Sequence, residues 1–372
     1  MKRLKLAALW LLLLLLTACG QASAPGWDTM EPIGHMDLSY AEQFRVDYYP
    51  ENLALITIGG TDEYLLVPEG GSTPEGLGQE IRVLHQPLDS IYLASSSAMD
   101  LFLRAEALEQ VTMTSTDAAG WTIPEIAAQV ESGTIRYVGK YSAPDYEAVV
   151  SEECKLAVEN TMIYHCPETK EQLEALGIPV LVERSSYEPH PLGRVEWIKL
   201  YGLLTGHPDT AERFFGESEE KLLALEDAAP TGKTASFFYI TSSGYANVRK
   251  PGDYISEMIR LAGGIYLFQE DQAVEDNALS TVNLPLENFY ASAREADILI
   301  YNSTVDGELE TLEDLLKKSP LLGDFKAVET GQVWCTNQNM FQQVSATADM
   351  IGDLHTVLTG EDQPLHFLHR LT

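Results

Sequence analysis

The sequence predicts an α/β protein of two α/β lobes joined by a single long helix, with a ligand cleft between the lobes. Two runs of short apolar strands alternating with helices, within residues 98–183 and 235–358, predict the lobes. A helix-permissive stretch between them predicts one connecting backbone helix over residues 191–229, and the Gly-His-Pro triplet at 206–208 can bend it. Strands alternating with helices of this length form largely parallel sheets, whose carboxyl-end loops bind ligands.

The composition is that of a folded and strongly acidic protein. The 372 residues include 24 basic and 56 acidic side chains, which gives a formal net charge of −32. A field of this sign repels phosphate backbones, so the composition disfavours a nucleic-acid partner and favours a cationic one. The length suffices for two domains that each bury a core.

The N-terminus carries an export signal. Basic residues precede the apolar run 7–16, and the small residues after it end at Cys19. The pattern predicts a signal peptide over residues 1–18, and Cys19 resembles the lipidated cysteine of bacterial lipoproteins. Residues 19–36 are then a flexible, lipid-anchored tether, and we expect an extracytoplasmic protein held at the cell membrane. A plain secretory signal with a chance cysteine is the alternative.

Residues 37–190 are predicted to form the N-terminal lobe. It begins with a β-rich addition, in which strands are separated by turns that contain Gly, Pro or Asn. Helices then appear where Ser95 to Ser97 and the Pro-Asp pair at 144–145 supply caps and where Gly177 supplies a stop. The predicted strands are 44–49, 53–58, 63–67, 81–85, 91–94, 111–114, 135–138, 156–159 and 180–183, and the predicted helices are 98–108, 123–130 and 167–176, with a further helix opening at 144–147.

Residues 230–372 are predicted to form the C-terminal lobe. Its strands are apolar runs between turn signals, and its helices show the longer apolar period. The predicted strands are 235–240, 298–301 and 332–336, and the predicted helices are 254–262, 287–294 and 342–358.

Enzyme signatures are missing from the sequence. It contains no nucleophile elbow, no phosphate-binding glycine loop and no paired-histidine zinc motif. His366 and His369 have the spacing of two metal ligands on a helix, but they lie in the last seven residues, where a frayed tail is expected. We therefore expect no catalytic residue, no cofactor and no bare metal ion bound by the protein. A secreted lyase or hydrolase is the alternative that these observations weaken.

Three cysteines remain after Cys19, namely Cys154, Cys166 and Cys335. Outside the cytoplasm thiols tend to oxidise, and at most one pair can form. Cys154 and Cys166 are the better candidates, but their spacing leaves both the paired and the reduced state open.

Polar residues gather where predicted strands end. Ser95 and Ser96 lie at a strand-to-helix turn whose free N–H groups can bind anions or carbonyls, although a simple helix cap is equally consistent with them. Tyr141 follows another strand, and the segment 241–249 follows a third. In that segment Arg249 is one of few cations, and its guanidinium suits carboxylate or catecholate oxygens, with a surface salt bridge as the alternative.

Aromatic residues also occur near these ends. Their rings can stack on a flat ligand or fill the core. They are Tyr141, Tyr164, Tyr187, Tyr245 and Trp334.

These blocks resemble the substrate-binding lipoproteins of ABC importers for iron chelates and cobalamin, which are periplasmic binding proteins with a rigid helical backbone. The resemblance covers about residues 80–360. The β-rich segment 44–81 has no counterpart that we can match, and Asp100 lies in an atypical helix. The similar blocks are the Ser-rich turn 95–99, the Gly-to-Glu segment 139–147, the helix entry 186–199, the block 252–264 and the strand 296–300.

The resemblance implies that the chain captures a metal chelate, most simply an iron–siderophore complex, and performs no covalent chemistry. It implies delivery to an ABC permease dimer with a cytoplasmic ATPase, with the binding protein acting as a monomer. Cobalamin or haem is the alternative ligand, and a lipid-anchored sensor or adhesin is the alternative class. The expected ligand contacts are Ser95, Ser96, Tyr141, Tyr245, Arg249 and Trp334.

The resemblance also implies a docking glutamate on the tip of each lobe. Glu188 and Glu287 stand where these residues are expected. The alternative for each is a solvated surface acid. The acidic net charge agrees with docking onto a cationic partner.

Overall fold

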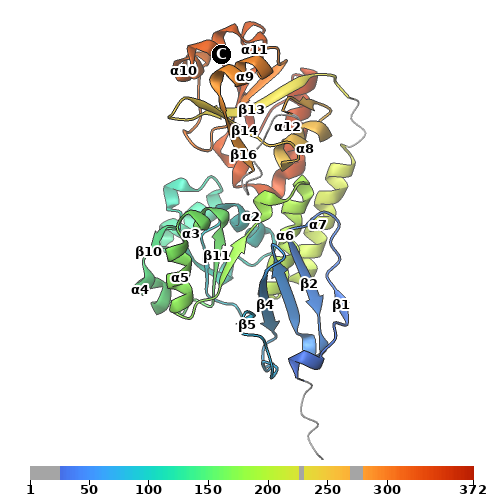
Figure 1. Ribbon diagram of the computed structural model, residues 1–372, viewed down its shortest axis with the longest axis vertical. Helices are drawn as coiled ribbons and strands as arrows, with labels where there is room; N and C mark the ends of the chain where they lie inside the picture. The colour runs from blue at the N-terminus through green and yellow to red at the C-terminus, as the bar shows by residue number, and fades with distance from the viewer. Residues whose placement is uncertain (1–25, 226–229, 269–279) are drawn as a thin grey trace, which may run out of the picture.

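The computed structural model describes residues 26–225, 230–268 and 280–372. Two sheet-containing lobes follow one another along the long axis of the molecule, and a further sheet from the N-terminal part of the chain lies beside the first lobe (Figure 1). The predicted two-lobe α/β architecture is confirmed.

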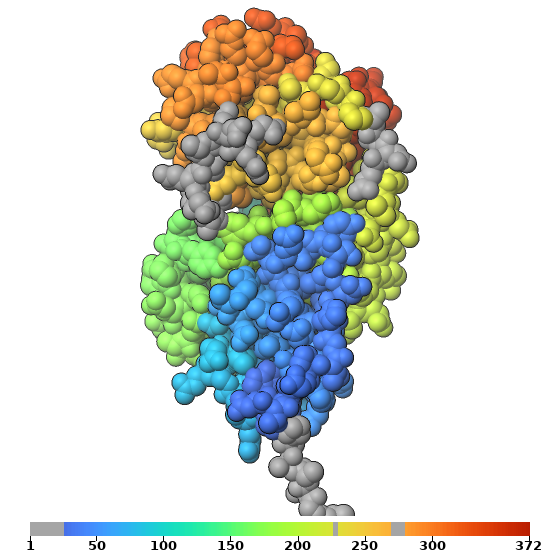
Figure 2. Space-filling model, turned by 45° about the vertical axis from the view of Figure 1, so that its right-hand side comes forward, coloured from blue at the N-terminus to red at the C-terminus, as the bar shows by residue number. Residues whose placement is uncertain are grey.

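The N-terminal sheet has five strands in chain order. They are β1 (Gly34–His35), β2 (Phe44–Tyr48), β3 (Ala54–Ile58), β4 (Asp62–Val67) and β5 (Arg82–His85). Neighbours are antiparallel except β4 and β5, which are parallel. All of β3 is buried, and its alternate residues Ala54, Ile56 and Ile58 belong to the large apolar cluster that also includes residues of the helical connection. The sheet is therefore an integral part of the body (Figure 2).

The first lobe is built on a fully parallel sheet with the strand order β12-β11-β6-β7-β8. The strands are β6 (Ile91–Leu93), β7 (Val111–Thr114), β8 (Arg136–Tyr137), β11 (Leu156–Asn160) and β12 (Val180–Glu183), and the helices are α2 (Ser96–Arg104), α3 (Pro124–Ser132), α4 (Tyr146–Ser151) and α5 (Pro167–Ala175). A small hairpin joins β9 (Gly139–Lys140) to β10 (Ala143–Pro144). Helix α2 ends four residues earlier than predicted.

The helical connection is present, but it consists of two helices rather than the single one predicted. Helix α6 (Pro191–Thr205) ends where Gly206 adopts a left-handed conformation, and α7 (Pro208–Leu223) begins two residues later. The two helices pack closely side by side (Figure 1), since a Cβ atom placed on Gly202 would lie 2.5 Å from that of Ala211. Gly206 and Pro208 therefore turn the chain back where the sequence predicted only a bend.

The second lobe contains a mixed sheet with the order β16-β14-β13-β17-β18-β19, and β15 pairs with β13. The strands β13, β15, β17 and β18 are parallel to their neighbours within this group, whereas β14, β16 and β19 run antiparallel to theirs. The strands are β13 (Thr234–Ile240), β14 (Tyr245–Arg249), β15 (Ile265–Tyr266), β16 (Thr281–Pro285), β17 (Ile298–Tyr301), β18 (Val333–Thr336) and β19 (Leu368–Arg370). The helices are α8 (Tyr254–Leu261), α9 (Leu286–Ala293), α10 (Leu312–Lys318), α11 (Lys326–Glu329) and α12 (Thr347–Thr359).

The C-terminal residues form strand β19, so the frayed tail expected there is wrong. The imidazole of His369 lies between Asn337, whose side-chain oxygen is 2.6 Å from Nδ1, and the Leu309 carbonyl, which is 2.8 Å from Nε2. Both ring nitrogens have partners within the second lobe, and the ring serves to hold the edge strand.

The lobes touch at several polar contacts. The Asp100 carboxylate of α2 accepts a hydrogen bond from the Ser345 backbone N–H at 2.8 Å. The Gln342 side chain accepts from the Thr122 N–H and donates to the Gly120 carbonyl, at 2.8 and 2.7 Å. Because α2 directly follows β6, these contacts place the carboxyl edge of the first-lobe sheet next to the second lobe.

Candidate functional site

A cation flanked by tyrosines lies at the carboxyl edge of the first-lobe sheet. Arg184 directly follows β12, while Tyr164 belongs to the 3₁₀ turn Thr161–His165 that follows β11. The Arg184 guanidinium donates from Nη1 to the Tyr164 hydroxyl at 3.3 Å and lies 4.9 Å from the centre of the Tyr187 ring. Met162 and Tyr164 are 49% and 47% exposed. Two adjacent parallel strands thus bring an aromatic, partly exposed surface together with a positive charge.

Sequence reasoning missed Arg184. Tyr164 and Tyr187 were recognised as aromatics that can stack, but nothing in the local pattern joined them to the arginine. The available signal was weak: an arginine comes immediately after a buried strand, at the position where parallel sheets collect ligand-binding residues.

The Ser-rich turn is arranged around a buried carboxylate. Ser95 is 1% exposed, and its hydroxyl donates to Glu183 Oε2 at 3.1 Å, while Glu183 Oε1 accepts the Ser185 N–H at 2.7 Å. The Ser95 side chain therefore neither caps α2 nor lies free for a ligand. Ser96 and Ser97 are partly exposed at the start of α2 and are the members of this turn that a ligand can reach.

Tyr141 lies in the turn between β9 and β10, half-buried between two apolar clusters of the first lobe. Burial is the main cause of its raised pKa, and the neighbouring Cys166 and Glu159 raise the pKa further. Glu159 is fully buried near the end of β11, and neither of its carboxyl oxygens has a hydrogen-bond partner among the described residues. Burial raises the pKa of Glu159 to about 8, so this carboxyl is mostly protonated at neutral pH.

Strand β14 holds Tyr245 and Arg249 at opposite ends. At ~3.4 Å per residue the two Cα atoms are separated by roughly 14 Å. Tyr245 is 43% exposed at the carboxyl edge of β13. Arg249 is mostly buried, where its Nη1 lies 3.5 Å from Asp253 Oδ2 and donates to Ser280 Oγ at 3.2 Å. Arg249 is therefore ion-paired inside the second lobe. It is neither the ligand contact that the sequence predicted nor the surface salt bridge that was the alternative.

Trp334 lies within the sheet of the second lobe. Trp334 belongs to β18 and pairs with Arg370 of β19, and the Arg370 guanidinium lies 5.9 Å from the centre of the Trp334 ring. Arg370 also donates to the Gly331 carbonyl ahead of β18, which places this contact toward the amino end of the strand. The structure does not bring Trp334 together with Tyr245 at the carboxyl edge.

Glu188 is 1% exposed, which corrects the expectation that it docks onto a permease. Its carboxylate accepts the N–H groups of Glu42 and Gln43 at 2.7 and 3.0 Å and the indole N–H of Trp197 at 2.7 Å. Glu287 differs, because it is exposed in the first turn of α9.

A second buried carboxylate binds the backbone directly before residues 42 and 43. We call the contacts of Glu188 and Glu196 with this segment the clamp on residues 39–43. Glu196 of α6 accepts the backbone N–H groups of Ser39, Tyr40 and Ala41 at 2.8 to 2.9 Å. Five consecutive backbone N–H groups, from residue 39 to residue 43, therefore end on Glu188 and Glu196. The two acids fasten the N-terminal sheet to the helical connection.

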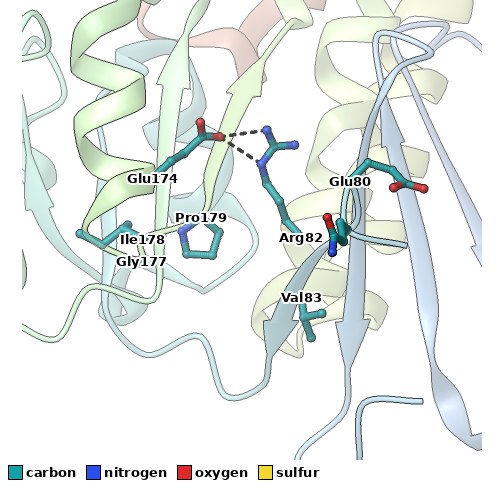
Figure 3. A pocket seen from close by; sticks show the side chains of 8 residues that line it. Glu80, Arg82, Val83, Glu174, Gly177, Ile178 and Pro179 are labelled. Atoms are coloured by element: carbon teal, nitrogen blue, oxygen red, sulfur yellow. Dashed lines mark hydrogen bonds and ion pairs between the residues drawn. The ribbon is translucent and has the colours of Figure 1, made fainter. Parts of the chain in front are cut away.

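The N-terminal sheet also contacts the first lobe, through its strand β5. Arg82 of β5 donates to Glu174 of α5 at 2.9 to 3.0 Å (Figure 3). Arg82 Nη1 also lies 3.7 Å from Asp62 Oδ1. A pocket of about 410 Å³ opens beside this contact, lined by Glu80, Val83, Ile178 and Pro179 among others. The pocket lies between the N-terminal sheet and the first lobe, at the amino end of β12 and away from Arg184.

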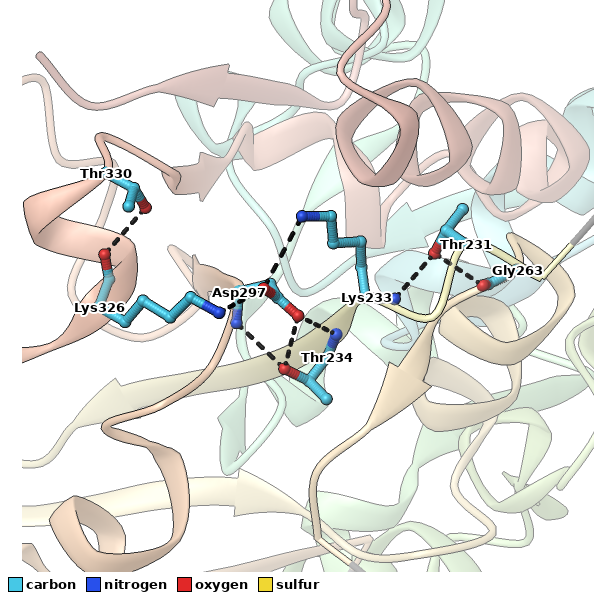
Figure 4. A network of polar contacts seen from close by, with 7 residues as sticks. All are labelled: Thr231, Lys233, Thr234, Gly263, Asp297, Lys326 and Thr330. Carbon is cyan, nitrogen blue, oxygen red and sulfur yellow. Dashed lines mark hydrogen bonds and ion pairs between the residues drawn. The ribbon is translucent and has the colours of Figure 1, made fainter.

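A further polar network closes the amino ends of β13 and β17. Asp297 accepts hydrogen bonds from the Thr234 N–H at 2.9 Å and from Lys326 at 2.8 Å, and Lys233 lies 3.8 Å away (Figure 4). Burial disfavours its charged form, but these hydrogen bonds outweigh burial and lower the pKa of Asp297 to about 2. The network satisfies the carboxylate within the lobe.

The remaining expectations concern the anchor, the thiols and metals. Cys19 lies outside the described residues. Cys154, Cys166 and Cys335 are all unpaired thiols in the structure. Within residues 26–225, 230–268 and 280–372, no three His, Cys, Asp or Glu side chains are grouped to hold a metal ion. The same residues include no helix with the length and apolar character needed to cross a bilayer.

Comparison with known families identifies the fold. The model of the periplasmic binding protein family matches residues 110–339, which is more than half of the chain. The chain belongs to this family. Its members are solute-binding proteins, so the expectation that the chain is not an enzyme is confirmed on this ground.

Solved periplasmic binding proteins share the two-lobe fold at low sequence identity. A haem-binding protein of Vibrio cholerae superimposes with a TM-score of 0.58 at 17% identity, covering 74% of this chain and 100% of its own. The vitamin B12 binding protein of the same organism gives 0.52 at 12% identity, covering 74% and 98%. A protein described as an ABC-type Fe³⁺-hydroxamate transport system, from Saccharomonospora viridis, gives 0.57 at 18%, covering 72% and 92%.

Two curated relatives extend over more of this periplasmic binding protein. Both are uncharacterized lipoproteins of Methanocaldococcus jannaschii. One is 23% identical over 87% of this chain and 82% of its own length, and the other is 22% identical over 94% and 91%.

Proposed function

We propose that this periplasmic binding protein is an extracytoplasmic lipoprotein that captures a metal chelate between its lobes and delivers it to the permease of an ABC importer. The observation that carries the proposal is the carboxyl edge of the first-lobe sheet. There the exposed Met162 and Tyr164 adjoin Arg184, next to the second lobe. An apolar and aromatic surface with a few polar groups suits a flat or bulky organic chelate.

The ligand would lie between the two carboxyl edges. Ser96 and Tyr141 would contact it from the first lobe and Tyr245 from the second, since all three are at least partly exposed at strand ends. The contacts of Asp100 and Gln342 with the second lobe would limit the lobes to a modest adjustment on binding.

An iron–siderophore complex is the proposed ligand, and haem or cobalamin is the rival within the same mechanism. The solved relatives named for haem, vitamin B12 and Fe³⁺-hydroxamate support this range of ligands. All of these ligands present extended organic surfaces, which is the property that the exposed tyrosines and Met162 match.

Attachment and docking complete the proposal. Lipidation of Cys19 would hold the protein at the membrane, and the names of the two curated relatives support this. Glu287 is proposed as a docking residue on the second lobe because its carboxylate is exposed at the start of α9. The partner would be a permease dimer driven by a cytoplasmic ATPase, with the binding protein acting as a monomer.

The decisive experiment is ligand titration followed by intrinsic fluorescence. The chain contains five Trp and 17 Tyr residues, which provide ample signal. Residues 20–372 would be titrated with ferric siderophores, their iron-free forms, haem and cobalamin. Submicromolar quenching by a ferric chelate and not by its iron-free form supports the proposal. Binding of haem or cobalamin alone replaces the proposed ligand, and the absence of any binding contradicts the proposed function.

A sensor or adhesin that retains the fold is separated from a transport component by uptake. Glu287→Lys should abolish ligand uptake in cells while leaving affinity in solution within twofold. The exposed Glu125→Lys on the first lobe provides a control of equal charge. Unchanged uptake with Glu287→Lys would remove this residue from the docking surface, and unchanged uptake in a strain without the protein would remove the transport role.

A further inference from the structure

Arg184 has an unusual charge environment for this chain. The protein carries a net charge of −32, and most described arginines have a carboxylate within 4 Å. Among the described arginines, only Arg184, Arg194 and Arg370 form no ion pair. Arg194 is 6% exposed and closed off from solvent, and Arg370 lies at the amino end of β18. Arg184 is the unpaired arginine at the carboxyl edge.

The guanidinium of Arg184 is nevertheless held firmly in place. Nε donates to the side-chain oxygen of Gln43 at 3.1 Å, and Nη1 donates to the Tyr164 hydroxyl. The side chain also packs on Gly59, whose added Cβ would lie 3.2 Å from Arg184 Cδ. All these partners are neutral, so they orient the guanidinium without compensating its charge.

Two of these supports come from the N-terminal sheet. Gln43 immediately precedes β2 and Gly59 immediately follows β3, while the clamp on Glu188 fixes the backbone N–H of Gln43 itself. The N-terminal sheet therefore reaches the ligand edge of the first lobe and positions one of its charges. This assigns a role to the β-rich addition, which the sequence left unmatched.

We propose that Arg184, positioned by Gln43, binds an anionic oxygen group of the ligand, and that the chain consequently selects carboxylate- or catecholate-bearing chelates over uncharged ones. A guanidinium fixed between Tyr164 and Tyr187 can pair with an oxygen anion while the rings contact the adjoining aromatic or apolar part. The inference rests on the proposed function and deepens it by naming the class of chelate.

The test compares anionic with uncharged ligands. Haem, with its propionates, and a ferric tricatecholate are the anionic probes, while a ferric trihydroxamate and cobalamin are the uncharged ones. Arg184→Ala should weaken anionic binding by about tenfold to a hundredfold and uncharged binding by less than threefold. Added NaCl screens both the attraction of Arg184 and the repulsion of the acidic protein, so anionic affinity should fall less, or rise more, with NaCl in Arg184→Ala than in the wild type.

A second substitution tests the positioning role without removing the arginine. Gln43→Glu places a carboxylate beside the guanidinium and should weaken anionic binding by at least tenfold. Arg136→Ala removes an exposed, ion-paired arginine at the opposite edge strand, β8, and should leave all affinities within twofold.

The outcomes separate this inference from the proposed function. If the wild type binds only uncharged chelates, or if Arg184→Ala leaves anionic affinity within twofold, the inference fails while chelate capture stands. If the wild type binds no chelate, haem or corrinoid at all, the proposed function fails and the inference fails with it. Among the anionic probes, preference for haem or for the catecholate identifies the source of the oxygen group.

Discussion

The Arg194 guanidinium lies 4.0 Å from the centre of the Tyr254 ring, which joins the helical connection to the second lobe. Arg194 belongs to α6 and Tyr254 is the first residue of α8. The Nε atom of Arg194 is buried without a hydrogen-bond partner among the described residues. At the junction between the lobes this buried charge thus interacts with the face of the Tyr254 ring, and it also attracts the Asp253 carboxylate, where it opposes the rise in pKa that burial causes.

Truncation of this arginine should loosen the junction. Arg194→Ala removes the stem that packs on Tyr254 and should lower the free energy of unfolding by about 2 kcal/mol. Arg194→Met retains the packing and removes the buried charge, so it should cost less than half as much. Chemical denaturation of both variants measures the difference. An alanine variant as stable as wild type would show that the contact contributes nothing.

The buried Glu159 should make stability depend on pH. Its pKa in the folded protein is about 8, above the ordinary value of 4.5, so the folded state binds the proton more tightly than the unfolded state. The contribution of Glu159 to the free energy of unfolding should therefore be greatest below pH 4.5. It should fall by up to ~1.4 kcal/mol per pH unit between pH 4.5 and about pH 8.

Glu159→Gln should remove this dependence. The amide cannot ionise, so the variant should be more stable than wild type at pH 8 and lose that advantage near pH 4.5. Thermal unfolding between pH 4.5 and 9 measures the effect, with the exposed Glu125→Gln as the matched control. Parallel curves for wild type and Glu159→Gln would contradict a protonated carboxyl at this position.

The clamp on residues 39–43 should be essential for the N-terminal sheet. Glu196→Gln replaces an acceptor of three N–H groups by a side chain that accepts through one oxygen, and should cost about 2 to 3 kcal/mol. Glu212→Gln removes only the exposed partner of Lys199 and should cost less than 0.5 kcal/mol.

Limited proteolysis locates the effect of the clamp. Cleavage between residues 37 and 43 should accelerate in Glu196→Gln and not in Glu212→Gln. Equal cleavage in both would mean that the sheet is held by its apolar contacts alone.

Two glycines in the helical connection provide a matched test of its packing. A Cβ on Gly202 would overlap that of Ala211 at 2.5 Å, whereas a Cβ on Gly216 would meet nothing within 4 Å. Gly202→Ala should therefore force α6 and α7 apart and destabilise the protein by about 1 to 3 kcal/mol. Gly216→Ala should be neutral or stabilise by up to about 1 kcal/mol, since alanine favours the helix. Equal melting temperatures for the two variants would contradict this helix pairing.

Local patterns in the sequence were sufficient to predict most strands and helices. Apolar runs such as 156–159 and 298–301 correspond to buried strands β11 and β17, and the alternation of strands with helices predicted the parallel sheet of the first lobe. These predictions succeed because strand formation and helix capping depend on residues close in the chain. The export signal is likewise a local pattern, although Cys19 lies outside the described residues.

Only the tertiary structure decided which polar side chains remain available. Glu188 is buried because the N–H of Glu42, 146 positions away in the sequence, binds it, and Arg184 is oriented by Gln43 at a separation of 141. Arg249 and Asp253 are only four residues apart, but the burial of Arg249 depends also on the rings of Phe237 and Phe341, which come from other parts of the second lobe. Burial and charge compensation arise from contacts between distant segments, so the sequence determined the elements and the fold class, and packing determined the site.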